Sequence, residues 1–123
     1  KIIWVKISVK LTTNFEKELK PLIKKYKSIF EDLDKLEKEL IKNPRLGTPL
    51  GKGAYKIRLK IASKGQGKSG GARVISFLDS SIIGLVDQVD ETSATVFLLS
   101  IYDKSDVASI SDKELRDLIK SLR

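Results

Sequence analysis

Lysine and arginine side chains offer most of the chemistry that this sequence can perform. The 123 residues include 24 Lys and Arg, 16 Asp and Glu, and neither His nor Cys. Their absence excludes Ser-His-Asp triads, thiol nucleophiles, disulfides and Cys- or His-based zinc sites. Acid–base chemistry at neutral pH therefore has to use Lys, Arg, Tyr or carboxylates. We expect neither a metal site nor a cofactor.

The excess positive charge comes from one segment. No Asp or Glu occurs between Asn43 and Leu78, and that stretch holds eight cations. They are Arg45, Lys52, Lys56, Arg58, Lys60, Lys64, Lys68 and Arg73. The other residues hold 16 cations against 16 acidic groups, so this segment accounts for the whole net charge of +8. Such segregation suits a polyanion, most commonly nucleic acid. The alternative is a solvated surface that only aids solubility.

Two periodicities predict the elements that position these cations. Apolar residues recur every three or four positions from Phe15 to Leu40, and Asn43-Pro44 follows. This pattern predicts a helical hairpin that breaks near Lys27 or Ser28. Capping boxes beginning at Thr13, Ser28 and Ser111 mark the expected helix starts. Strands are expected from their period of two, over residues 2–11, 55–61, 72–78 and 95–102.

These elements predict one α+β domain over residues 1–123. An N-terminal strand and a helical hairpin would pack on an antiparallel sheet, and a C-terminal helix would close the domain. Residues 45–54 are expected to form a Gly/Pro loop. Residues 82–89 either continue the preceding strand or form another one, and the stretch from Asp79 to Thr95 has no assignment.

One strand is expected to present a fully cationic face. Lys56, Arg58 and Lys60 alternate with the apolar residues of the segment 55–61. Because successive side chains of a strand point to opposite faces, the three cations share one face. We expect this face, together with Lys52, to contact nucleic acid.

A near-match to the phosphate-binding loop of nucleotide triphosphatases is rejected. Residues 62–69, ASKGQGKS, differ from that motif by Ala62 in place of its first Gly. The motif requires a helix immediately after it, whereas residues 72–77 are strand-like. The segment is therefore expected to be a flexible hairpin loop, or a mobile cationic loop that approaches phosphate.

Several segments resemble the RelE/HigB toxins of bacterial type II toxin–antitoxin systems. They are NPRLGTPLG (43–51), YKIRL (55–59), SKGQGKSGGARVI (63–75) and LLSIYDKSD (98–106). The resemblance covers nearly the whole chain, and the basic Gly-rich stretch followed by Gly-Ala-Arg is its most specific part. It implies a small ribonuclease that cuts messenger RNA, usually in the ribosomal A site, and that a cognate antitoxin restrains.

The resemblance also implies roles for individual residues. RNA is then cleaved by its own 2′-hydroxyl, which attacks the adjacent phosphate, and the enzyme stabilises the added charge. Arg73 matches the family's arginine at the scissile phosphate. Arg58, on the cationic face of the preceding strand, is the next choice, or else a surface or carboxylate-paired arginine. Lys64 and Lys68 are candidates for base or phosphate clamp, or else simple phosphate tethers. Tyr102 would stack on a base or supply a proton, whereas as a buried sheet aromatic it would do neither. Lys104 falls where the family carries a basic residue.

Two departures from the family leave the general acid unassigned. The segment 103–106, DKSD, has less arginine than the family's, and no Tyr follows Tyr102. Two alternatives therefore stay open: a non-nuclease toxin of the ParE type that acts on DNA gyrase, and a non-catalytic RNA- or ribosome-binding module.

We expect a cytoplasmic protein. No apolar run approaches the roughly 20 residues of a membrane span. Lys6 and Lys10 interrupt the apolar start, so no signal peptide is expected.

Overall fold

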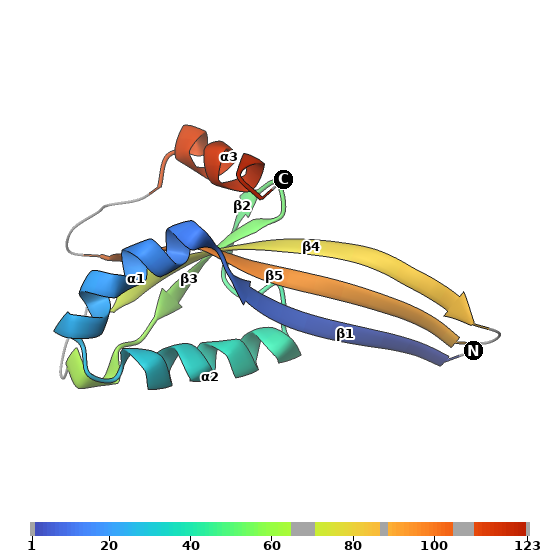
Figure 1. The fold of residues 1–123 in the computed structure, drawn as a ribbon, viewed down its shortest axis with the longest axis horizontal. Coiled ribbons are helices and arrows are strands. Elements are labelled where there is room, and N and C mark those ends of the chain that lie inside the picture. Colours follow the sequence, from blue (N-terminus) through green and yellow to red (C-terminus); the bar gives the residue numbers. More distant parts are fainter. Residues whose placement is uncertain (1, 65–70, 87–88, 105–109, 123) are drawn as a thin grey trace.

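A five-stranded mixed sheet with helices on both faces organises the chain (Figure 1). The computed structural model describes residues 2–64, 71–86, 89–104 and 110–122. Its elements are β1 (Ile2–Leu11), α1 (Thr13–Lys25), α2 (Ile29–Lys42), β2 (Thr48–Gly51), β3 (Ala54–Leu59), the 3-10 turn η1 (Ala62–Lys64), β4 (Ala72–Val86), β5 (Val89–Asp103) and α3 (Asp112–Lys120). The expected α+β class and the helical hairpin are confirmed.

The expected antiparallel sheet is found for β2 to β5, but the N-terminal strand joins this sheet in parallel instead of packing on it. The strand order is β1-β5-β4-β3-β2, and β1 runs parallel to β5 while the other neighbours are antiparallel. β1 and β5 are separated by most of the chain, so no short hairpin dictates their relative direction. The alternation of apolar and polar residues within a strand indicates which face is buried, but it does not indicate whether the strand runs parallel or antiparallel to its neighbour.

The stretch that had no assignment belongs to a long hairpin. β4 and β5 each contain 15 residues and pair from Ala72↔Asp103 to Val86↔Val89. Their distal halves and β1 form an arm that projects beyond the helices (Figure 1). β2 corrects the expected loop over residues 45–54, since Thr48 pairs with Lys56 of β3. It has four residues, two of them Pro49 and Gly51, which is too little for a period of two to be visible.

Each face of the sheet has its own apolar core. The first core joins α1 and α2 to the side chains of Ile57, Leu59, Val74, Val96 and Ile101, among others. The second core places Leu115 of α3 against Ala54, Ile75 and Leu99. Figure 1 shows α2 and α3 on opposite sides of the sheet. Below, these two faces are called the α2 face and the α3 face.

Helix α1 completes the edge of β5 where β1 ends. The last β1–β5 pair is Leu11↔Leu98. Beyond it, Thr12 Oγ1 donates to the Leu98 carbonyl at 2.9 Å, and Asn14 Nδ2 donates to the Leu99 carbonyl at 2.9 Å. Glu18 Oε1 accepts from the hydroxyl of Ser100 at 2.6 Å and from the backbone N–H of Ile101 at 3.3 Å. Side chains thus replace the ladder bonds that a longer β1 would have made.

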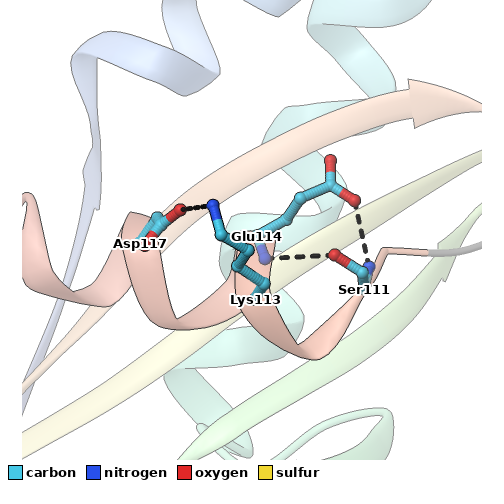
Figure 2. A network of polar contacts seen from close by, with 4 residues as sticks. All are labelled: Ser111, Lys113, Glu114 and Asp117. Carbon is cyan, nitrogen blue, oxygen red and sulfur yellow. Dashed lines mark hydrogen bonds and ion pairs between the residues drawn. The ribbon is translucent and has the colours of Figure 1, made fainter.

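The caps follow the expected boxes in part. The box at Ser111 is confirmed: its Oγ accepts from the Glu114 N–H, and Glu114 accepts from the Ser111 N–H (Figure 2). The first N-cap is Thr12 rather than Thr13, because Thr12 Oγ1 accepts from the Phe15 N–H. Ser28 precedes α2 but makes no cap bond: its hydroxyl accepts from the Ser63 N–H at 2.8 Å and donates to Asp32 Oδ2 at 2.7 Å.

None of the helices in the described ranges is both long enough and apolar enough to cross a membrane.

Gly71 lets the backbones of β3 and β4 meet at the start of β4. Its φ is +94°, and a Cβ built there would lie 2.4 Å from the Leu59 carbonyl oxygen. Any larger residue would therefore suffer both backbone strain and a clash with main-chain atoms. Gly51 has a similar φ of +87° but no atom within 4 Å of such a Cβ.

We predict that Gly71→Ala destabilises the fold more than Gly51→Ala. Both substitutions carry the left-handed backbone cost of about 1 to 2 kcal/mol. Only Gly71→Ala adds overpacking, worth about 1 to 3 kcal/mol. Chemical denaturation of the two variants measures the difference. Equal losses of unfolding free energy would contradict the close approach at Leu59.

We also predict that Glu18 stabilises the fold through its carboxyl oxygen. Glu18→Ala leaves the Ser100 hydroxyl and the Ile101 N–H without their acceptor, which costs about 1 to 3 kcal/mol for buried groups. Glu18→Gln keeps an oxygen acceptor and should retain most of the stability. If the two variants unfold at the same denaturant concentration, Glu18 does not complete the edge of β5.

Candidate nucleic-acid interface

Two arginines and a tyrosine form a row across three strands. Arg58 of β3 lies opposite Arg73 of β4, and Arg73 lies opposite Tyr102 of β5. Ala72 and Val74, the chain neighbours of Arg73, are buried in the core of the α2 face, so Arg73 projects from the α3 face. Directly opposed residues have Cβ atoms about 4.5 to 5.5 Å apart and share a face. We call this arrangement the Arg58–Arg73–Tyr102 row.

A β-bulge brings Tyr102 into the row. Val96 and Leu98 belong to the core of the α2 face, and strict alternation would place Tyr102 with them. The β4–β5 register shifts between Ile75 and Ser76, which pair with Ser100 and Leu98 respectively. Leu99 is thus the extra residue, and the bulge moves every later side chain of β5 to the other face. Tyr102 accordingly packs on the α3 face.

Neither arginine of the row is neutralised within the described part of the chain. The ion pairs there are Lys25–Asp103, Lys38–Asp34 and Lys113–Asp117. Among the described residues, the guanidinium of Arg73 donates only to the adjacent Ala72 carbonyl, at 3.3 Å. Like charges directly opposed on a sheet destabilise the folded state. An anion bound between Arg58 and Arg73 would relieve this repulsion.

Three lysines flank the row. Lys56 lies on the same face of β3 as Arg58, two residues before it, and is partly exposed. Lys60 and Lys104, both exposed, follow the ends of β3 and β5 on either side of Gly71. The Lys104 N–H donates to the Gly71 carbonyl at 3.4 Å, and a Cβ on Gly71 would lie 3.7 Å from the Lys60 Cα. The positive potential therefore extends to this end of the sheet.

Tyr102 has a hydroxyl group that is shielded from solvent and makes no hydrogen bond with any residue described. Burial raises the pKa of this phenol above its ordinary value of 10.0, and the charge of Glu114 raises it further. The neighbouring Arg73 opposes both effects and lowers the pKa. The phenol is thus protonated at neutral pH and is a hydrogen-bond donor without a partner, a state that a buried group usually avoids.

The start of the basic Gly-rich segment is anchored to α2. The Ser63 N–H donates to Ser28 Oγ at 2.8 Å, and the Ser28 N–H donates to Ser63 Oγ at 3.1 Å. The buried carboxylate of Asp32 accepts from the Ala62 N–H at 3.2 Å. Residues 65–70 lie outside the described ranges. Of the residues described after this segment, Gly71 comes first and Ala72 begins β4, so the expected strand is confirmed.

The remaining predicted site residues fall in different places. Lys52 lies in the turn between β2 and β3, with a left-handed φ of 58°, at the opposite end of β3 from Lys60. The structure therefore does not bring Lys52 to the row. The backbone of Lys64 belongs to η1, but its side chain and the whole of Lys68 lie outside the described residues.

An acidic hollow beside the row was not foreseen from the sequence. It has a volume of about 420 Å³ and is lined by residues of α1, β5 and α3. Its polar side chains include Asn14, Glu18, Ser100, Tyr102, Glu114 and Asp117. Within the described ranges, no three carboxylates gather closely enough to hold a metal ion. The sequence predicts Glu114 as a capping residue of the last helix. That Glu114 also lines the same hollow as Tyr102 depends on the packing of α3.

No protein-family model matches the chain. The case for a function therefore rests on the chemistry of the site and on the sequence motifs.

We predict that Arg73 and Glu114 shift the pKa of Tyr102 in opposite directions. Arg73→Ala should raise that pKa, and Glu114→Gln should lower it while keeping the capping box, because Gln also serves at that position. Phenolate absorbance during alkaline titration measures the shifts, and Tyr102→Phe identifies the transition among the three tyrosines. A Tyr102 transition that neither variant moves would contradict the placement of these groups.

The same pKa sets a stability trend at high pH. Because folding raises the pKa of Tyr102, the folded state binds the proton more tightly than the unfolded state. The stabilisation is present below the unfolded value and is lost as the pH rises through the folded pKa. Unfolding measured on both sides of pH 10.0 should therefore show a smaller alkaline loss in Tyr102→Phe than in the wild type.

Proposed function

We propose that the chain is a metal-independent endoribonuclease of the RelE/HigB toxin type. The observation that carries this proposal is the direct opposition of Arg58 and Arg73, with no described carboxylate to neutralise either of them. A phosphate between them would accept hydrogen bonds from two planar guanidinium groups, the geometry for which arginine is best suited. The reaction would break the bond between the phosphorus and the 5′-oxygen of the next nucleotide and so cut the RNA backbone.

The two arginines would act on the transition state. When the 2′-hydroxyl attacks, the phosphorus becomes five-coordinate and its equatorial oxygens gain negative charge. Preorganised cations stabilise that charge more than they stabilise the substrate, and this difference lowers the barrier. Arg73 is central in the row and only partly exposed, so we assign it to the scissile phosphate. Arg58, which is exposed, would hold a second oxygen or the adjacent phosphate.

Proton transfer would involve groups at the same end of the sheet. The phenol of Tyr102 is protonated at neutral pH, so it would donate a hydrogen bond or a proton and would not act as a base. Lys104 lies beside the row and would add positive charge there. Lys64 and Lys68 keep their proposed role as base or phosphate clamp.

The proposal includes the partners that the toxin family implies. These are a cognate antitoxin, the ribosome and its messenger RNA, in the cytoplasm. Support comes from the quoted motifs and from the order of elements, in which a strand and a helical hairpin precede the antiparallel strands and a closing helix. The long β4–β5 arm has no counterpart in the motifs that carry the resemblance.

We predict that Arg73→Ala lowers messenger RNA cleavage about 10²- to 10³-fold, the usual effect of removing one transition-state donor. Arg58→Ala should lower it less. Primer extension on a message translated with the purified protein locates and quantifies the cuts. Arg45→Ala is the matched control, because it removes the same charge from an arginine that contacts Tyr55 Oη at 3.4 Å instead of the row.

Three results would redirect the proposal. If the Arg73→Ala variant cleaves as well as the wild type, Arg73 does not take part in cleavage. Uncut messages together with inhibited DNA supercoiling by gyrase would indicate the ParE-type toxin. Ribosome binding by the wild type without any cut would indicate a non-catalytic binding module.

A further inference from the structure

The acidic hollow adjoins the Arg58–Arg73–Tyr102 row at its tyrosine end. Asn14 and Glu18 of α1 form one wall, Ser100 and Tyr102 of β5 form the floor, and α3 forms the opposite wall. Tyr102 belongs both to the row and to the hollow, so a group bound to Arg73 would have its neighbouring atoms at the mouth of the hollow. Ile110 and Leu118 add apolar surface to the lining.

The three carboxylates of the hollow each have one oxygen without a hydrogen bond to any described residue. Glu114 uses Oε1 to accept from the Ser111 N–H at 3.1 Å, and Asp117 uses Oδ2 to contact Lys113 Nζ at 3.5 Å (Figure 2). Glu18 is the most engaged of the three, because its Oε1 accepts from Ser100, Ile101 and Asn14. The hollow thus offers acceptors on α3 to a ligand that carries N–H donors.

The charges on the two sides of Tyr102 have opposite signs. Arg58 and Arg73 attract a phosphate, whereas Glu114 and Asp117 repel it. Ionised carboxylates only accept hydrogen bonds, so they favour a neutral group rich in N–H. A nucleotide has both parts, an anionic phosphate and a neutral base, a short distance apart. The arrangement would orient it with its phosphate on β3 and β4 and its base toward α3.

We infer that the hollow is a nucleobase subsite that selects a base with an exocyclic amino group, namely adenine, cytosine or guanine, over uracil. This inference rests on the proposed function, because it places the base of the nucleotide whose phosphate Arg73 holds. Glu114 and Asp117 accept from the amino group, as carboxylates accept from the amino group of cytosine. Uracil has no amino group; its single N3–H donor lies between two carbonyl oxygens, which the carboxylates repel.

The size and lining of the hollow suit a base. Its volume of about 420 Å³ lies within the 300 to 1,000 Å³ range of small-ligand pockets. Proteins that read single-stranded RNA stack unpaired bases on aromatic rings and bond their edges with polar side chains. The ring of Tyr102 and the carboxylates of α3 supply these two kinds of contact.

The test measures the affinity of the full chain for short single-stranded RNAs. Each probe is an oligouridine that carries one adenosine, cytidine or guanosine, and unmodified oligouridine is the reference. A 2′-deoxy sugar on the varied nucleotide and on both of its neighbours removes the hydroxyls that would attack the phosphates beside it and prevents cleavage there. We expect each amino-bearing probe to bind about tenfold more tightly than oligouridine, the size of one good base contact.

The decisive variant is Glu114→Gln combined with Asp117→Asn. In each variant the amide oxygen can keep the present contact, with the Ser111 N–H or with Lys113 Nζ, so the cap of α3 is retained. The amide NH2 group then replaces the second carboxylate oxygen and is a donor instead of an acceptor. We expect the preference for amino-bearing bases to fall to about twofold or less, with equal or tighter binding of oligouridine. Asp112→Asn is the control: it removes one charge from the same helix outside the hollow, and it should keep the full preference.

The outcomes separate this subsite from the nuclease proposal. If the double variant keeps the wild-type preference, the subsite is wrong, while cleavage that depends on Arg73 still supports the nuclease. If the preference is lost in the double variant but the wild type cuts no message, the subsite stands without the catalytic proposal. If the wild type binds all probes equally, or none, the subsite is overturned.

Discussion

The register of β3, β4 and β5 is the constraint on which the candidate site depends. Arg58, Arg73 and Tyr102 come from three strands, and they meet because each is opposite the next. A shift of one residue in either pairing would turn a member of the row toward the core of the α2 face. Two local features support the alignment: the backbone contact at Gly71 and the bulge at Leu99. The chemistry of the site is therefore a consequence of strand alignment.

The charges of the site follow from the same alignment. Two opposed guanidinium groups raise the free energy of the unliganded fold, and the apolar cores on both faces compensate for that cost. Arg73 is flanked by Ala72 and Val74, which are fully buried, so its backbone is fixed while its side chain reaches the surface. Glu114 is held in place by the cap of its own helix. Tyr102 lies between the two charges and is influenced by both.

The elements were largely predictable, whereas their mutual placement was not. The period of two over residues 55–61 and the capping signal at Ser111 depend on neighbours in the chain, so a single sequence contains them. The bulge at Leu99 has no such signal, and strict alternation would place Tyr102 on the wrong face. The parallel pairing of β1 and the packing of α3 beside β5 depend on contacts between distant segments. For this reason the sequence predicts the cations of the site but does not predict its carboxylates.

The projecting arm separates two ends of the molecule. Ile2 pairs with Val89, so the start of β1 and the start of β5 share one tip, at the opposite end of the β4–β5 pairing from Arg73. Two-residue changes in the length of all three strands would preserve their inward and outward alternation. A fluorophore or an affinity tag attached to β1 at this tip would therefore leave the end of the sheet that carries Arg58 and Arg73 unobstructed.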